Sequence, residues 1–110
     1  MHHTNTRIYR RSLELVALSR ETLEKLPVGY GFLANQLRRA VASCALNFAE
    51  GCGKNTPRER RRFFNMAKAS AYEVAAIFDV GAELGGIDSG SQSRAQDIVD
   101  HIAGMLHRYR

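Results

Sequence analysis

Apolar residues recur every three or four positions along most of the chain, which is the spacing of one face of an α-helix. Prolines and glycines interrupt this pattern three times, near residues 27–29, 51–53 and 85–86. Before the third segment, Thr56-Pro57-Arg58-Glu59 has the threonine, proline and glutamate of a helix-starting capping box. The sequence therefore predicts four helices, at about residues 6–26, 31–51, 57–84 and 92–109.

Four amphipathic helices with short connections predict an all-α fold, an antiparallel up-down four-helix bundle. The 110 residues are enough for one hydrophobic core, so we expect a single domain over residues 1–110. A run of about 18 apolar residues is absent from the sequence, so we expect no membrane span and a cytoplasmic location.

The apolar stripe of each predicted helix indicates which side faces the core. In the third helix the stripe begins at Phe63, which we therefore assign to the core. Phe64 is a weaker core candidate, and in principle both rings could instead stack on nucleic-acid bases. In the first helix the expected stripe has heptad-like spacing and contains Tyr9, Leu13, Val16, Arg20 and Leu23, with Leu15, Leu18 and Leu26 beside it.

The second helix is apolar over most of its circumference. One stripe runs from Leu33 through Cys44 to Phe48, and several alanines together with Leu46 lie away from it. A helix of this kind is buried on more than one side. In so short a chain we expect the second burial partner to be another subunit, so the sequence predicts self-association.

The net charge of +5 is spread unevenly. Residues 1–62 hold twelve Lys and Arg against five Asp and Glu, a net charge of +7, whereas residues 63–110 hold four against six, a net charge of −2. This asymmetry predicts a basic surface on the first half that attracts a polyanion.

Four arginines stand in the first two turns of the third helix, namely Arg58, Arg60, Arg61 and Arg62. The start of a helix carries a partial positive charge, so cations there are unfavourable by about 0.3–1 kcal/mol each unless an anion binds. We interpret this cluster, extended by Lys54, Arg38 and Arg39, as a candidate phosphate-binding site.

A structural interpretation of the cluster stays open. The arginines could instead pair with Glu50, with Glu59 or with carboxylates of a neighbouring subunit. Arg7, Arg10 and Arg11 at the start of the first helix are expected to form a solvated face.

Other chemistry is not expected from the sequence. Cys44 and Cys52 are about 12 Å apart on a helix, too far for a disulfide bond, and His101 and His107 have a poor spacing for a metal. Gly51-x-Gly53-Lys54 lacks the spacing and the Ser/Thr of a phosphate-binding loop. We therefore predict a protein without catalytic residues, cofactor or metal.

Glu50 and Glu73 lie beside apolar residues and need partners if they are buried. We expect Arg38 or Arg39 to pair with Glu50, and Lys68 to pair with Glu73.

Three segments carry a resemblance to a known family: YGFLANQLRRAVAS (30–43), NFAEGCGK (47–54) and RRFFNMAKASAYEV (61–74), followed by LG (84–85). Through them the chain resembles the bacterial four-helix-bundle proteins that are encoded in intervening sequences of large-subunit rRNA genes. The likeness covers about residues 8–108, and the A-E-G-x-G corner is its most specific part. Cys44 and Ala45 replace the Ile-Pro of the usual family motif.

The resemblance implies a basic homopentamer, assembled as a ring. It also implies a relation to the accessory proteins of diversity-generating retroelements, which engage a reverse transcriptase and RNA. The family's motif positions in this sequence are Arg38, Arg39, Asn47, Glu50, Gly51, Gly53, Lys54, Phe63 and Glu73.

Two functional hypotheses follow. The first is a non-enzymatic, oligomeric protein that binds RNA or DNA through phosphate contacts with little base readout. The second is an adaptor that docks another protein, such as a reverse transcriptase. The sequence leaves open the choice between RNA and DNA, any sequence preference and the cellular pathway.

Overall fold

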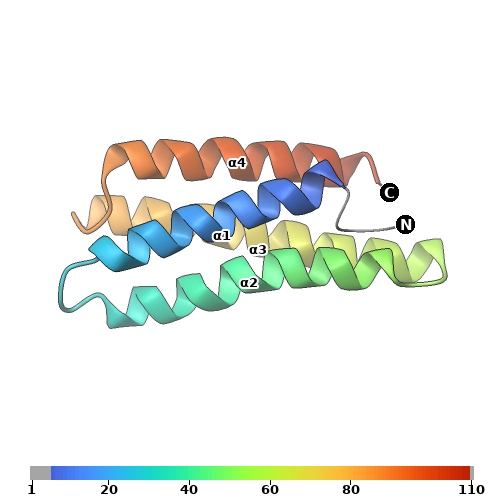
Figure 1. The fold of residues 1–110 in the computed structure, drawn as a ribbon, viewed down its shortest axis with the longest axis horizontal. Helices are drawn as coiled ribbons and strands as arrows, with labels where there is room; N and C mark the ends of the chain where they lie inside the picture. Colours follow the sequence, from blue (N-terminus) through green and yellow to red (C-terminus); the bar gives the residue numbers. More distant parts are fainter. Residues whose placement is uncertain (1–5, 110) are drawn as a thin grey trace.

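The computed structural model describes residues 6–109. They form four α-helices, and no strand is present in this part of the chain, so the predicted all-α fold is confirmed (Figure 1). The helices are α1 (Arg7–Lys25), α2 (Gly31–Cys52), α3 (Pro57–Glu83) and α4 (Ser89–His107). None of them is long and apolar enough to cross a membrane.

Side chains cap three of the helix starts. The hydroxyl of Thr6 accepts a hydrogen bond from the Tyr9 amide at 3.1 Å, and Thr56 does the same for Glu59 at 3.2 Å. A cap of this kind satisfies an amide that has no partner inside the helix. The capping threonine that the sequence predicted at the start of α3 is therefore present.

The fourth helix begins earlier than predicted, at Ser89 rather than near residue 92, because Asp88 caps it. The carboxylate of Asp88 accepts a hydrogen bond from the Ser91 amide at 2.7 Å and another from the Ser91 hydroxyl at 3.0 Å. Both bonds lower the pKa of the Asp88 carboxyl, and the bond from the Ser91 amide has the larger effect.

The helices lie side by side along a molecule of 45 × 21 × 19 Å (Figure 1). Their contacts form a closed cycle, in which α2 packs on α1 and α3, and α4 packs on α3 and α1. The buried apolar side chains of all four helices form one core, whose largest fully buried members are Phe48, Phe78, Ile8, Leu15, Leu18, Leu37 and Ile102.

The core face of α1 is not the predicted one. Ile8, Leu15 and Leu18 are buried together with polar residues of the same face, whereas Leu13 of the expected stripe is 45% exposed. The buried polar residues are Ser12, Ser19 and Thr22, and among the described residues no hydrogen-bond partner is present for the Ser19 and Thr22 hydroxyls. The prediction was wrong because the neighbouring face is more apolar than the face that enters the core.

The core assignment of the two adjacent phenylalanines is reversed. Phe64 is buried and stacks on Phe48, with 5.3 Å between the ring centroids, whereas Phe63 is only half-buried. The reason lies in Gly51, where a Cβ would stand 2.7 Å from the Phe64 ring. Gly51 therefore permits the close approach of α2 to α3, and the helix continues past it to Cys52 rather than stopping there.

Candidate nucleic-acid interface

The two ends of the described chain lie at the same end of the molecule as the connection between α2 and α3 (Figure 1). Tyr109, just after α4, has its ring 6.5 Å from that of Phe48 and 5.8 Å from that of Phe64. At the start of α1, Arg11 Nε donates a hydrogen bond to His101 Nδ1 of α4 at 3.0 Å. The helices thus bring together segments that are far apart in the sequence.

Basic side chains gather at this end, which we call the basic end. It is defined by the nine residues Arg7, Arg10, Arg11, Lys54, Arg58, Arg60, Arg61, Arg62 and Arg108, from all four helices or their ends. Four carboxylates of the described chain, Glu14, Glu50, Glu59 and Asp100, lie at the same heights. The structure therefore separates charge by end of the molecule rather than by half of the sequence.

The opposite end is acidic. It carries Glu21, Glu24, Asp79, Glu83 and Asp88, with the cations Arg20, Lys25 and Arg94 among them. At this end, the amide group of Gln92 in α4 donates a hydrogen bond of 2.9 Å to the carboxylate of Asp79 in α3. Together the two ends give the molecule a long-axis charge asymmetry, which favours an end-on approach of a polyanion.

Three of the predicted arginines are available to a ligand. Arg58, Arg61 and Arg62 are exposed, and none of them forms an ion pair with a carboxylate of the described chain. Pairing with Glu50 or Glu59 within one chain is therefore not what holds them. Their guanidinium groups can offer forked hydrogen bonds to phosphate oxygens.

Arg60 has a structural role that the sequence did not reveal. Its Nη1 donates a hydrogen bond to the carbonyl oxygen of Lys54 at 3.0 Å, and the side chain is half-buried. This carbonyl lies just beyond the end of α2, where helix carbonyls lack partners and attract cations. The adjacent end of α2 thus offsets part of the repulsion between the arginines and the start of α3.

Lys54 and Arg62 flank the half-buried ring of Phe63. The Lys54 ammonium lies 4.9 Å from the ring centroid and the Arg62 guanidinium carbon lies 5.6 Å from it. Lys54 Nζ is also 3.8 Å from Glu50 Oε2, so Lys54, and not Arg38 or Arg39, is the partner of Glu50. Phe63 therefore holds two cations of the basic end in place.

Arg38 and Arg39 do not join this cluster. They precede Lys54 by about sixteen residues of α2, which corresponds to about 24 Å along the helix. Arg38 borders a groove between α1 and α2, and Arg39 lines a cleft between α2 and α3 together with Glu73. The predicted pair of Lys68 with Glu73 is not formed within the described residues.

Arg7, Arg10 and Arg11 were expected to form a solvated face, and Arg7 and Arg10 are exposed, whereas Arg11 is half-buried. The sequence did not indicate that they lie at the same end of the molecule as the arginines of α3. The expected up-down order of the four helices could have predicted this proximity, because it places the starts of the first and third helices at one end of the bundle.

A model of the 23S rRNA-intervening sequence protein family matches residues 4–108. The chain belongs to this family. Among curated proteins, no match to the chain was found.

In this member of the 23S rRNA-intervening sequence protein family, motif residues tie α2 to α3. The amide group of Asn47 donates hydrogen bonds to the carbonyl and hydroxyl oxygens of Ser43, at 2.9 and 2.8 Å. The Ser43 hydroxyl lies 2.8 Å from that of Ser70 in α3. Asn47 and Gly51 of the family motif therefore act in helix packing.

Cys44 does not offer a reactive thiol. Burial raises its pKa to about 11, an effect that a hydrogen bond with the Ser12 hydroxyl partly offsets. Both cysteines are free and buried. In residues 6–109, no group of three or more His, Cys, Asp or Glu side chains is arranged to hold a metal ion.

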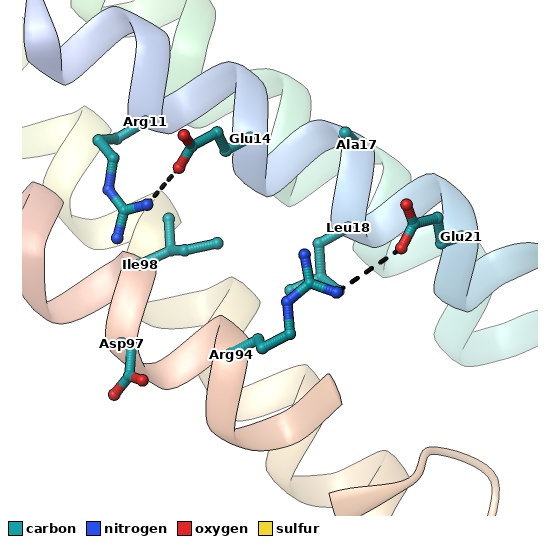
Figure 2. Close-up of a pocket in the computed structure, with 8 residues that line it drawn as sticks. All are labelled: Arg11, Glu14, Ala17, Leu18, Glu21, Arg94, Asp97 and Ile98. Atoms are coloured by element: carbon teal, nitrogen blue, oxygen red, sulfur yellow. Dashed lines mark hydrogen bonds and ion pairs between the residues drawn. The ribbon is translucent and has the colours of Figure 1, made fainter. Parts of the chain in front are cut away.

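Two grooves flank α1 in this 23S rRNA-intervening sequence protein. The groove between α1 and α4, with a volume of about 440 Å³, is lined by Arg11, Glu14, Ala17, Leu18, Glu21, Arg94, Asp97 and Ile98. Figure 2 shows Arg11 joined to Glu14, and Arg94 joined to Glu21 across the groove at 3.8 Å.

The groove between α1 and α2 has a volume of about 370 Å³ and an apolar lining. Its apolar wall contains Tyr9, Leu13, Val16, Leu23, Val41, Ala42, Ala45 and Leu46, and its two charged residues are Arg20 and Arg38. Leu46 is 67% exposed, and this groove contains most of the stripe that the sequence assigned to the core of α1.

Proposed function

We propose that this chain is a non-enzymatic protein that binds RNA or DNA through phosphate contacts made by its basic end. The observation that carries the proposal is the gathering of nine Lys and Arg residues from all four helices or their ends against four carboxylates. Three of those residues, Arg58, Arg61 and Arg62, are exposed and have no ion pair within the described chain.

The dimensions of the basic end fit a nucleic-acid backbone. The molecule is 21 × 19 Å across its long axis, which matches about six phosphates of one strand of B-form DNA at about 3.4 Å each. Most protein–DNA hydrogen bonds go to phosphate and sugar oxygens, and arginine and lysine are frequent donors, so we expect binding to depend on charge more than on sequence.

We further propose that the antiparallel up-down four-helix bundle predicted from the sequence assembles into a ring-like homo-oligomer in the cytoplasm. A homopentamer is the size that the family resemblance implies. The closed cycle of helix contacts supports the bundle, and the exposed apolar groove between α1 and α2 supports the assembly.

The test is fluorescence anisotropy with a labelled single-stranded RNA at several salt concentrations. We expect binding of the wild type at low salt, and much weaker binding of the Arg58/Arg61/Arg62→Ala variant. For a single-stranded ligand, each lost phosphate contact lowers the slope of log affinity against log salt by about 0.7, so the triple variant should lower it by about 2.

Arg94→Ala is the control for the single variant Arg61→Ala, because both arginines are exposed but Arg94 lies towards the acidic end. Equal losses for these two single variants would contradict the role of the basic end. Absence of any binding at low salt would remove the whole proposal.

An adaptor that docks a protein, such as a reverse transcriptase, is the second candidate. The basic end would then meet an acidic surface of that partner rather than a nucleic acid. Pull-down from the native host with and without nuclease separates the two functions: a partner that survives nuclease favours the adaptor.

A further inference from the structure

The groove between α1 and α2 presents a helical seam in which Leu13 and Leu46 are 45% and 67% exposed. On α1, the residues Tyr9, Leu13, Val16, Arg20 and Leu23 follow each other at intervals of four and three. On α2, the other wall of the groove, Arg38, Ala42 and Ala45 are also spaced by four and three positions. Seams with this spacing pack against another helix, whose side chains fill the spaces between them.

A matching ridge lies on α3. Its residues are Met66, Ala69, Glu73, Ala76 and Val80, again at intervals of three and four, and all except the half-buried Met66 are exposed. These residues lie away from the buried face of α3, which contains Phe64, Ala67, Ala71, Val74 and Phe78. The ridge is thus an amphipathic helix face of small and apolar side chains with one carboxylate.

We propose that the α3 ridge of one copy packs into the α1–α2 groove of the next copy, with Glu73 between Arg20 and Arg38. The occupant is a second copy of this chain, so the inference rests on the self-association proposed above and adds which two surfaces meet.

Charge complementarity selects this pairing. The groove has two arginines and no carboxylate, and the five ridge residues include one carboxylate, Glu73, which shares a cleft with Arg39 of α2. Within the described chain, neither Arg20, Arg38 nor Glu73 forms an ion pair. A charge that enters an apolar contact needs a partner of opposite sign, and the second copy supplies it.

The heights of these residues along the molecule agree when the two copies point in the same direction. The Ser43 and Ser70 hydroxyls are 2.8 Å apart and mark one level of α2 and α3. From that level, Arg38 lies about 7.5 Å and Glu73 about 4.5 Å towards the acidic end, at about 1.5 Å per residue. The difference of about 3 Å is within the reach of an arginine side chain.

Arg20 lies near the same height. Ser12 Oγ of α1 is 3.9 Å from Cys44 Sγ of α2, and Arg20 is eight residues beyond Ser12 while Arg38 is six residues from Cys44. The two arginines therefore differ by about 3 Å in height.

Ridge and groove are different surfaces of one molecule, so each copy offers one of each. Repetition of such a head-to-tail contact builds a ring when its rotation closes. Parallel copies then place every basic end on one side of the ring.

Charge reversal tests the contact by light scattering over a range of protein concentrations. We expect Glu73→Arg to raise the concentration needed for half-assembly at least tenfold, and Arg38→Glu combined with Arg20→Glu to do the same. Joining all three changes should restore most of the assembly. Circular dichroism checks that each variant is folded, and Ala76→Glu on the exposed ridge is a second variant that should also dissociate the oligomer.

Arg39→Glu is the matched control, because Arg39 shares a cleft with Glu73 inside one chain. If Arg39→Glu restores the assembly of Glu73→Arg, the proposed contact is wrong. The contact is also wrong if Glu73→Arg alone assembles like the wild type. In both cases the oligomer itself stands. A monomeric wild type overturns both the contact and the assembly. RNA anisotropy on the same proteins then reports separately on the function of the basic end.

Discussion

The two grooves that flank α1 are similar in volume and opposite in chemistry. On the α4 side, an ion pair between Arg94 and Glu21 crosses the groove, and Arg11 hydrogen-bonds to His101. On the α2 side, exposed leucines line a groove whose two arginines have no ion pair within the described chain. The same helix thus has one side with paired charges and one side with exposed apolar side chains.

This difference shows why the volume of a groove does not identify an interface. The larger groove, between α1 and α4, exposes charged side chains that water can solvate, and its two arginines form ion pairs with its two glutamates. The smaller groove exposes an apolar lining, whose contact with water is unfavourable by about 25 cal/mol for each Å². The apolar lining, rather than the volume, is therefore the reason for proposing the α1–α2 groove as an interface.

The largest effect is expected from Leu18→Ala. Leu18 is fully buried beneath the groove on the α4 side, so its truncation should lower the free energy of unfolding by about 2–5 kcal/mol. Leu13→Ala, in the apolar groove, should cost less than about 1 kcal/mol in the dissociated protein because Leu13 is already exposed. Urea denaturation at low protein concentration measures both, and equal losses would mean that Leu13 belongs to the core.

An intermediate effect is expected on assembly from Leu46→Glu. Loss of a buried leucine contact costs about 1.5–3 kcal/mol, so the change should weaken assembly by about tenfold or more. The exposed position of Leu46 in one copy means that the fold should survive. Light scattering provides the measurement, with Ala17→Glu in the other groove as the control; dissociation by the control alone would reverse the assignment of the two grooves.

The smallest effect is expected from Arg94→Ala, which removes the ion pair across the polar groove. Both side chains are more than half exposed, at 63% and 51%, so the free energy of unfolding should change by less than about 1 kcal/mol. Urea denaturation should therefore give nearly the wild-type midpoint, and light scattering the wild-type size. A large change in either would show that the polar groove also carries an interface.

The sequence predicted helices well where local chemistry determines them. Thr56 and Pro57 start α3 as expected, and the missed start of α4 is also local, because Asp88 had not been considered as its cap. Helix faces were predicted less well. The core face of α1 contains Ser12, Ser19 and Thr22, so a rule based on apolar spacing chose the more apolar neighbouring face.

The candidate site was predictable in part. The exposed arginines of α3 were found because they crowd a helix start, a local signal. The α3 arginines lie at the same end of the molecule as Arg7 and Arg10, and far from Arg38, because of how the helices are arranged in space. The role of Arg60 depends on its hydrogen bond to one backbone carbonyl beyond α2, and the spacing of residues in the sequence does not predict such a bond.

The position of the chain ends has a practical consequence for labelling. The start of α1 and the end of α4 both lie at the basic end (Figure 1), so an affinity tag or fluorophore fused to either would screen the surface under test. The connection between α1 and α2 lies at the acidic end, and Val28 there is fully exposed, at 104%. A cysteine introduced at this position would carry a reporter away from the basic end, while the buried native thiols stay unlabelled.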